Sequence, residues 1–377
     1  MGHLQDVDSV GRLWRRPLAV AAASVAVLGA GAAAADGPPS PATLIEFAGV
    51  ARSFDVAGGR VAWIDSAWVL HVRSLRSGAE TTIRYTNPYQ EVPSLTKGRS
   101  LVLGPSRVLW HGTRTVGGFE DADHVYVAAV GATRARPVAK TLHGDGGSGD
   151  GGAGAYLAGI AGTSTGFAYG LVKVGETQDQ SHFQVDGGGV LVLTGTTPRL
   201  LPGAPPAIVL AENAGRVAIA PVDMGQHESG TPLAAGAVEI RNATTGALVS
   251  SVTPTGNLRA AALTPTMLVV LTAGQIVRYD AASGRLLGST SVAADTAADL
   301  DASGTRVAFR RTRSVGVLDA ATGRISKVVA TPGRPTSVAL DGSTLAWTEQ
   351  RRTAPGKVSK KTFVTRIETI ALASSHG

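Results

Sequence analysis

A short hydrophobic motif recurs along the chain, and this repetition constrains the fold more than any other feature of the sequence. Each copy begins with a polar or small residue, continues through an apolar residue and a small or apolar one, and ends on an aromatic or branched residue. Strand-like runs bounded by Gly, Pro, Asp, Asn or Ser surround the copies, and no long segment has helical periodicity. Such repetition predicts one small unit of strands that is used many times. The copies are Arg60-Val61-Ala62-Trp63, Arg107-Val108-Leu109-Trp110, Gly166-Phe167-Ala168-Tyr169, Arg216-Val217-Ala218-Ile219, the weaker Met267-Leu268-Val269-Val270, Arg306-Val307-Ala308-Phe309 and Thr344-Leu345-Ala346-Trp347.

A polar turn is repeated between the motif copies. Residues 280–285 (DAASGR) and 319–324 (DAATGR) are nearly identical, residues 242–246 (NATTG) match them, and residues 74–78 (SLRSG) match loosely. The Asp or Asn side chain caps backbone N–H groups of the turn, and the Gly supplies the positive φ that closes it. Because the same turn recurs between strand-like runs, we expect these Asp residues to form hairpin turns rather than to bind a ligand.

Four strands can be counted in the repeats where the pattern is clean. In the repeat at 295–332 we expect strands near 298–301, 306–310, 315–318 and 325–329. This count predicts a unit of four antiparallel strands joined by tight turns.

The last repeat is one strand short. Its predicted strands lie near 336–340, 345–349 and 363–372, whereas residues 43–47 (TLIEF) precede the first repeat and have no partner of their own. We expect 43–47 to supply the missing outer strand, because this pairing would close a ring and remove its exposed sheet edges. The third and fourth strands of the repeat at 155–204 cannot be separated from the sequence.

These repeats resemble the broad superfamily of seven-bladed β-propellers with WD40-like, quinoprotein-like or TolB-like repeats. The closest motif copies are 38 and 39 residues apart, near the roughly 40–50 residues of a four-stranded blade. The resemblance implies an all-β fold of seven four-stranded antiparallel blades, closed by an N-terminal strand that completes the last blade. None of the five Trp residues is followed by Asp, and the tryptophan-docking motifs of quinone-dependent dehydrogenases are not visible. The resemblance therefore implies an architecture and no particular function.

The N-terminal segment has the pattern of an export signal. Arg12, Arg15 and Arg16 precede an uncharged, alanine-rich stretch at 18–35, which ends in three alanines before Asp36. This pattern predicts a secreted or cell-envelope protein. The alternative is a membrane tether that keeps 18–35. The predicted parts are a signal peptide at 1–35, a Pro/Gly-rich linker and start of the closing strand at 36–44, the propeller at 45–373 and a tail at 374–377.

Composition excludes several kinds of chemistry. The chain has no Cys, so disulfides, Cys-ligated zinc and thiol nucleophiles are excluded. Its formal charge is +7, but the basic residues form no dense run and do not alternate with aromatic residues, so we do not expect nucleic-acid binding. The Gly/Asp run at 144–152 lacks the apolar residues of calcium-binding repeats and is predicted to be a flexible linker.

Long connections after the second strand of a repeat are the predicted ligand-binding face. Equivalent connections of antiparallel blades lie at the same end, and those at 111–123, 170–181, 221–236 and 350–361 are expected to be long loops. Loops carry function more often than strands do. The first three, with His124 next to the first and His182 next to the second, hold the candidate residues, which are His111, Glu120, Asp121, Asp123, His124, Glu176, Asp179, His182, Asp223, His227 and Glu228.

Two functions remain open at this point. The first is a monomeric binding or scaffolding module without a cofactor, which recognises a protein, a peptide or a cell-wall glycan. The second is a propeller lyase, lactonase or hydrolase, in which His111, His124, His182 and His227 would meet in one central cleft and could hold a divalent metal. No two His have the spacing of a familiar metal motif, and no phosphate-binding loop or serine-hydrolase elbow is present.

Overall fold

The computed structural model describes residues 40–49, 51, 53–84, 100–117, 120–144, 153–162, 166–176, 183–195, 197–222, 236–293, 295–297, 299–352 and 363–372. Contacts between backbone positions divide the chain into Met1–Pro38, which lies outside these residues, and a unit from Pro39 to Gly377. Every regular element described in this second unit is a strand. No helix of membrane-spanning length and hydrophobicity is found in the described part of the chain.

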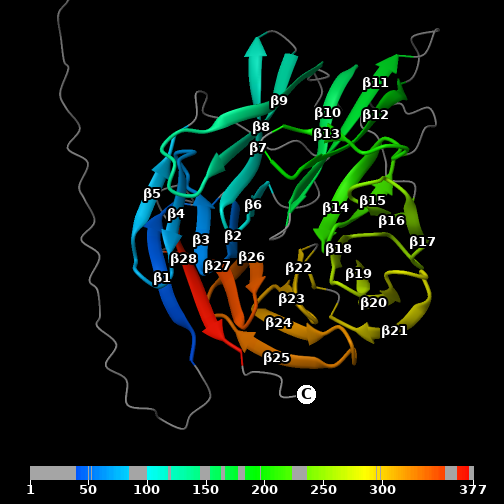
Figure 1. Ribbon diagram of the computed structural model, residues 1–377. Coiled ribbons are helices and arrows are strands. Elements are labelled where there is room, and N and C mark those ends of the chain that lie inside the picture. The colour runs from blue at the N-terminus through cyan, green and yellow to red at the C-terminus, as the bar shows by residue number, and fades with distance from the viewer. Residues whose placement is uncertain are drawn as a thin grey trace, which may run out of the picture. The chain divides into compact units, whose positions relative to one another are not determined.

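The predicted seven-bladed β-propeller is confirmed. Four-stranded antiparallel blades follow one another around a ring, with the first strand of each blade innermost (Figure 1). Blade 1 consists of β2 (Ser53–Ala57), β3 (Arg60–Ile64), β4 (Leu70–Ser74) and β5 (Glu80–Ile83), and blade 2 of β6 (Leu101–Leu103), β7 (Arg107–Gly117), β8 (Glu120–Ala129) and β9 (Arg136–Gly144). Blade 3 consists of β10 (Gly154–Gly162), β11 (Phe167–Glu176), β12 (Phe183–Leu193) and β13 (Arg199–Leu200), and blade 4 of β14 (Ala207–Asn213), β15 (Arg216–Pro221), β16 (Val238–Asn242) and β17 (Leu248–Val252).

The last three blades include the one that closes the ring. Blade 5 consists of β18 (Ala260–Leu263), β19 (Met267–Thr272), β20 (Gln275–Asp280) and β21 (Leu286–Ser291), and blade 6 of β22 (Leu300–Ser303), β23 (Arg306–Arg311), β24 (Ser314–Asp319) and β25 (Ile325–Ala330). Blade 7 consists of β26 (Arg334–Asp341), β27 (Thr344–Arg352), β28 (Phe363–Ala371) and the N-terminal strand β1 (Ala42–Ala48).

The N-terminal strand completes blade 7, as the sequence predicts. β1 pairs antiparallel with β28, with Ala42 opposite Thr369 and Ala48 opposite Val364. The Thr43 hydroxyl donates a hydrogen bond of 2.8 Å to Oε1 of Glu368 across this pair. The pairing covers the edge of β28 that would otherwise be exposed.

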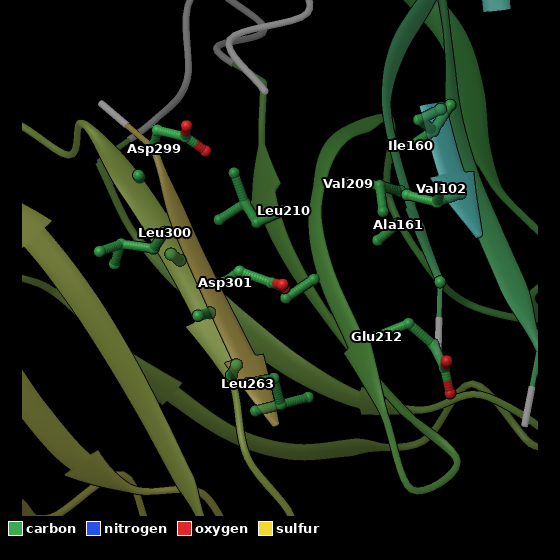
Figure 2. A pocket seen from close by; sticks show the side chains of 16 residues that line it. Val102, Ile160, Ala161, Val209, Leu210, Glu212, Leu263, Asp299, Leu300 and Asp301 are labelled. Atoms are coloured by element: carbon green, nitrogen blue, oxygen red, sulfur yellow. The ribbon is translucent and has the colours of Figure 1, made fainter. Parts of the chain in front are cut away.

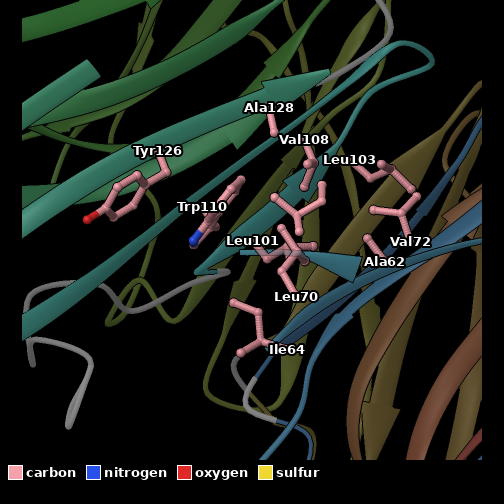
Figure 3. Close-up of a cluster of buried hydrophobic side chains, with 11 residues drawn as sticks. Ala62, Ile64, Leu70, Val72, Leu101, Leu103, Val108, Trp110, Tyr126 and Ala128 are labelled. Carbon is pink, nitrogen blue, oxygen red and sulfur yellow. The ribbon is translucent and has the colours of Figure 1, made fainter. Parts of the chain in front are cut away.

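The recurring motif forms the seams between blades. Its second, third and fourth residues are at most 5% exposed in every copy, because side chains alternate along the strand and each blade is covered on both faces. The second and fourth residues share a buried cluster with the third residue of the motif in the preceding blade, and Figure 3 shows Ala62, Val108 and Trp110 in one such cluster. The other seams are Phe167 and Tyr169 on Leu109, Val217 and Ile219 on Ala168, Leu268 and Val270 on Ala218, Val307 and Phe309 on Val269, Leu345 and Trp347 on Ala308, and Val61 and Trp63 on Ala346.

The Asp and Asn turns have the predicted hydrogen bonds. Oδ1 of Asp280 accepts bonds from the backbone N–H groups of Ala282 and Ser283, at 3.1 and 2.8 Å. Asn242 caps its turn in the same way, through Thr244 and Thr245. These side chains therefore act as structural caps.

The hairpins of blades 2 and 3 are longer than those of most other blades, and here the sequence prediction of loops was wrong. Residues 111–123 are mostly strand, not loop, because β7 and β8 have 11 and 10 residues and pair up to Gly117 and Glu120. β11 and β12 have 10 and 11 residues, so 170–176 is also strand, whereas β3, β15, β19 and β23 have five or six residues. In blade 7, β27 has nine residues and continues to Arg352, so 350–352 of a predicted loop is also strand.

The lengthened strands join blades 2 and 3 into one sheet. β9 pairs with β10 through His143 and Gly154, which gives an eight-stranded sheet from β6 to β13. Most of the Gly/Asp run predicted as a linker, 145–152, connects these two strands and lies outside the described residues.

Candidate functional site

The antiparallel blades give the ring two different ends. We call the end with the connections between second and third strands the hairpin face, because β7–β8 and β11–β12 are elongated there. We call the opposite end, with the first-to-second and third-to-fourth connections, the turn face. Hydrogen bonds join turns of neighbouring blades at the turn face, including Gly59 N–H to Asp341 at 3.2 Å and Arg60 to the Pro105 carbonyl at 2.8 Å.

His111 and Asp123 lie inside the seam between blades 2 and 3. Asp123 is fully buried, and its Oδ2 accepts a 3.0 Å hydrogen bond from the backbone N–H of Leu157 on β10. His111 is 2% exposed, and neither ring nitrogen has a hydrogen-bond partner among the described residues. Burial lowers the pKa of His111 to about 4, although the nearby Asp123 carboxylate acts in the opposite direction. His111 is therefore a neutral interior side chain.

His124 points to the other side of the same blade. It pairs with Gly112, one position beyond His111, and side chains at successive strand positions face opposite ways. Its ring lies 5.9 Å from that of Tyr126, which stacks in turn on Trp110 at 5.6 Å in the seam with blade 1. The structure thus separates His111 and His124 by the thickness of a sheet.

The remaining candidates lie at or beyond the ends of the long hairpins. Glu120 and Asp121 are part of β8, and the description there covers the backbone only. Glu176 is exposed at the end of β11. Outside the described residues lie Asp179, His182, Asp223, His227 and Glu228, together with most of the predicted loops 221–236 and 350–361.

The centre of the ring holds a narrow acidic cavity. It is lined by inner strands of blades 2 to 6, and Figure 2 shows Glu212, Asp299 and Asp301 along it. Its volume is about 80 Å³, and a second cavity of about 190 Å³ lies toward the turn face, with Asp55 and Asp341 in its wall. Cavities of this size hold water molecules, whereas small-molecule sites are usually about 300–1,000 Å³.

Carboxylates beside these cavities connect the blades. Oδ2 of Asp55 accepts the backbone N–H of Leu103 at 2.7 Å, and Oδ2 of Asp301 accepts that of Leu340 at 2.6 Å. Both residues lie opposite the third motif residue of their own blade, and both bonds reach the inner strand of the next blade. These acidic side chains therefore hold neighbouring inner strands together.

A titratable cluster that the sequence prediction missed lies in blade 1. His71 Nδ1 is 2.9 Å from Glu80 Oε1, and its Nε2 is 3.2 Å from Asp65 Oδ2. The ring stacks on Trp63 with centroids 4.8 Å apart. Burial favours the neutral ring, but the two carboxylates outweigh it and raise the pKa of His71 to about 9. Pairing β3 with β4 across the turn at Asp65 places His71 opposite Trp63, so hairpin register was the signal that could have revealed this cluster.

Within the part of the chain that the structure describes, no group of three or more His, Asp or Glu side chains is arranged to hold a metal ion. The buried His111 and Asp123 also face a closed seam and not the central cavity. The described candidates therefore do not form one chemical site.

Comparisons with known proteins identify a fold without a family. No protein-family description matches the chain, and no curated protein matches it. Among solved structures, the β-propeller domain of Cps50 (Swd1) from Myceliophteria thermophila is 12% identical and covers 87% of this chain and 99% of its own, with a TM-score of 0.51. BamB from Moraxella catarrhalis (14% identical, 82% of each chain, TM-score 0.39) and apo AztD from Citrobacter koseri (13%, 77% of this chain and 74% of its own, TM-score 0.42) are more distant in structure. The first likeness agrees with the strand topology, and the chain has the fold of a seven-bladed β-propeller.

Proposed function

We propose that this protein is an exported binding or scaffolding module that recognises a protein or cell-envelope ligand through its hairpin face. The observation that carries the proposal is the pair of elongated hairpins in adjacent blades. At about 3.3 Å per residue, the extra residues of β11 and β12 add roughly 15 Å to that side of the ring. The additional residues form a raised surface that hairpins of six-residue strands do not provide.

Packing against blade 4 makes this surface rigid. Val172, Val174 and Val185 of the β11–β12 hairpin belong to one buried cluster with Ile208 and Ala220. A ligand that binds a rigid surface does not have to order it, so less of the binding free energy is lost.

The hairpin is also polar and accessible. Lys173 is exposed on the side opposite Val172 and Val174, and Glu176 and Asp186 are exposed near the end of the hairpin. Mixed charges of this kind suit a polar protein or glycan surface, and their exposure gives positions from which a ligand can be captured.

Site-specific photocrosslinking tests the proposal. A photoreactive residue is placed at Lys173 or Glu176, with exposed Thr322 on the turn face as the matched control position. The protein is then irradiated with secreted and envelope fractions of the source cells. One ligand captured from both hairpin positions and not from Thr322 supports the proposal. Capture of the same ligand from all three positions, or of none from any position, contradicts it.

The enzyme alternative depends on residues outside the described ranges. Metal analysis by mass spectrometry on untagged protein, before and after incubation with calcium, zinc or manganese, tests it directly. A stoichiometric metal that is lost in H182A/H227A would replace the binding proposal with a metal-dependent enzyme.

N-terminal sequencing of the exported protein tests export: a start near Asp36 supports cleavage of 1–35, and retention of 18–35 supports a tether.

A further inference from the structure

Arginine side chains gather at the turn face. Five blades each carry an exposed arginine in the third-to-fourth-strand turn or at the start of the fourth strand, and these residues are Arg76, Arg134, Arg199, Arg285 and Arg324. A second group begins the second strand of four blades, is half-buried, and consists of Arg60, Arg107, Arg216 and Arg306. Each of the first six blades therefore contributes positive charge to the same end of the ring.

Acidic groups near these arginines are engaged in the fold, but they keep their charge, and Asp280 interacts electrostatically with Arg285. Asp280 and Asp319 cap their own turns, and Asp341 accepts the N–H of Gly59 in the neighbouring blade. Among the half-buried arginines, Arg60 donates to the Pro105 carbonyl, and Arg107 donates to the Thr194 carbonyl at 2.9 Å. Carbonyls are neutral partners, so these contacts position guanidinium groups without cancelling their charge.

Large aliphatic side chains are exposed beside this charge in four consecutive blades. Leu200 is 57% exposed, Leu248 53%, Leu286 59% and Ile325 40%. The last three each begin the outer strand of their blade, so they lie at the same level of the ring, next to the turns. Leu200, Leu286 and Ile325 directly follow an arginine in the sequence.

We propose that the turn face, on the side of blades 3 to 6, docks onto the surface of a bilayer that contains anionic lipids. Arginines attract the negative headgroups, and aliphatic side chains at the same level enter the boundary between headgroups and acyl chains. A soluble polyanion would need only the arginines, so the exposed aliphatic residues favour a bilayer. In this orientation the hairpin face points away from the membrane.

Vesicle binding tests this arrangement. Protein is mixed with vesicles of phosphatidylcholine alone, or of phosphatidylcholine with phosphatidylglycerol, and bound protein is separated by flotation. The full chain and a version that begins at Pro39 are compared, so that any binding by the N-terminal apolar segment is measured separately. We expect binding to the anionic vesicles only, by both versions.

Two double variants separate the charge from the apolar contact. R285Q/R324Q is expected to lower partitioning about 25-fold, since each basic residue near an anionic surface contributes about fivefold. L286S/I325S is expected to lower it about fivefold. The matched control R313Q/L142S changes an exposed arginine between β23 and β24, on the hairpin face, and an exposed leucine on β9, and it should bind like the parent. Circular dichroism and thermal unfolding verify that all variants keep the fold.

The outcomes distinguish this proposal from the proposed function. Absence of binding to anionic vesicles, or equal losses in the control, overturns membrane docking and leaves the crosslinking result unaffected. Unchanged binding by L286S/I325S also overturns it, because the face would then be a site for polyanions in general. Failure of Lys173 or Glu176 to capture a ligand, with vesicle binding intact, contradicts only the hairpin-face proposal.

Discussion

At the scale of single residues, the third motif position is the most constrained. Ala346 is fully buried in the seam where Val61 and Trp63 of the next blade pack against it. The substitution Ala346→Leu adds three carbon atoms to a filled space, and we expect it to lower the free energy of unfolding by about 1–3 kcal/mol. Urea denaturation measures the change. Ala282→Leu, in an exposed turn, should stay within about 0.5 kcal/mol of the parent, and equal effects at both sites would contradict the seam packing.

His71 should make stability depend on pH in the alkaline range. Its pKa is raised to about 9 in the folded protein, above the value of about 6.5 for an unfolded chain. The ion pairs with Asp65 and Glu80 therefore stabilise fully below pH 6.5, and their contribution is lost as pH rises through 9. Because His71 is partly exposed, we expect a loss of about 2 kcal/mol. Urea denaturation between pH 6 and 10 should show this loss in the parent and not in His71→Gln; parallel curves would contradict it.

His111 should make stability depend on pH in the acidic range, where stability decreases as pH falls. Its pKa in the folded protein is lowered to about 4, so the unfolded chain takes up a proton first as pH falls below 6.5. Stability should therefore decrease between pH 6.5 and 4, by up to about 3 kcal/mol. His111→Leu removes this dependence, and it also removes two buried nitrogens that have no hydrogen-bond partner among the described residues, so it should be at least as stable as the parent at pH 7. A less stable variant with the same pH profile would show that His111 makes an essential polar contact.

At the scale of elements, β1 has the clearest role. It pairs with β28, its Glu46 forms an ion pair with Arg366, and its Phe47 stacks 6.3 Å from Trp63 of blade 1. A chain that begins at Ser53 loses all of these contacts and exposes the edge of β28. We expect it to unfold at lower urea concentration and to self-associate, whereas a chain that begins at Pro39 should match the full protein. Light scattering after gel filtration, with urea denaturation, distinguishes the two, and a stable monomer from Ser53 would contradict the closing role.

Element prediction succeeded where the determinants are local. The strands predicted near 306–310 and 325–329 are found as β23 and β25, with ends within one residue, because the motif and the capped turn at Asp319 fix them. The hairpin of blade 2 was missed because its polar residues between His111 and Asp123 resemble a loop. Those residues pair with each other and with β9. The strand propensities of the individual residues do not predict such pairing.

The candidate site was harder to predict than the fold for the same reason. Whether a His side chain faces solvent or a seam depends on its position in the alternation of side chains along the strand. This alternation could not be assigned once the strand had been predicted as a loop. His111 and Asp123 are therefore near in sequence and space, yet enclosed between blades. His71, in contrast, acquires both carboxylates through the pairing of β3 with β4 and of β4 with β5.

At the scale of the whole propeller, one packing rule is used at every seam. The fourth motif residue of each blade, which is aromatic or branched, lies in one buried cluster with the third motif residue of the blade before it. The seam between blades 7 and 1 has the same arrangement. The two ends of the ring are then free to differ, one with elongated hairpins and the other with arginines and aliphatic residues. A rigid ring with two dissimilar ends is suited to hold two partners at a fixed separation.

The strand β1 also has a consequence for how the gene can be arranged. Since β1 and β28 lie side by side and the seam they help to form resembles all others, neighbour relations among the blades are cyclic. A circular permutant that links residue 372 to residue 42 and opens the chain in another third-to-fourth-strand turn keeps every seam and every blade. Natural selection can therefore relocate the point at which the polypeptide starts, and can fuse other domains there, without rewriting the blades themselves.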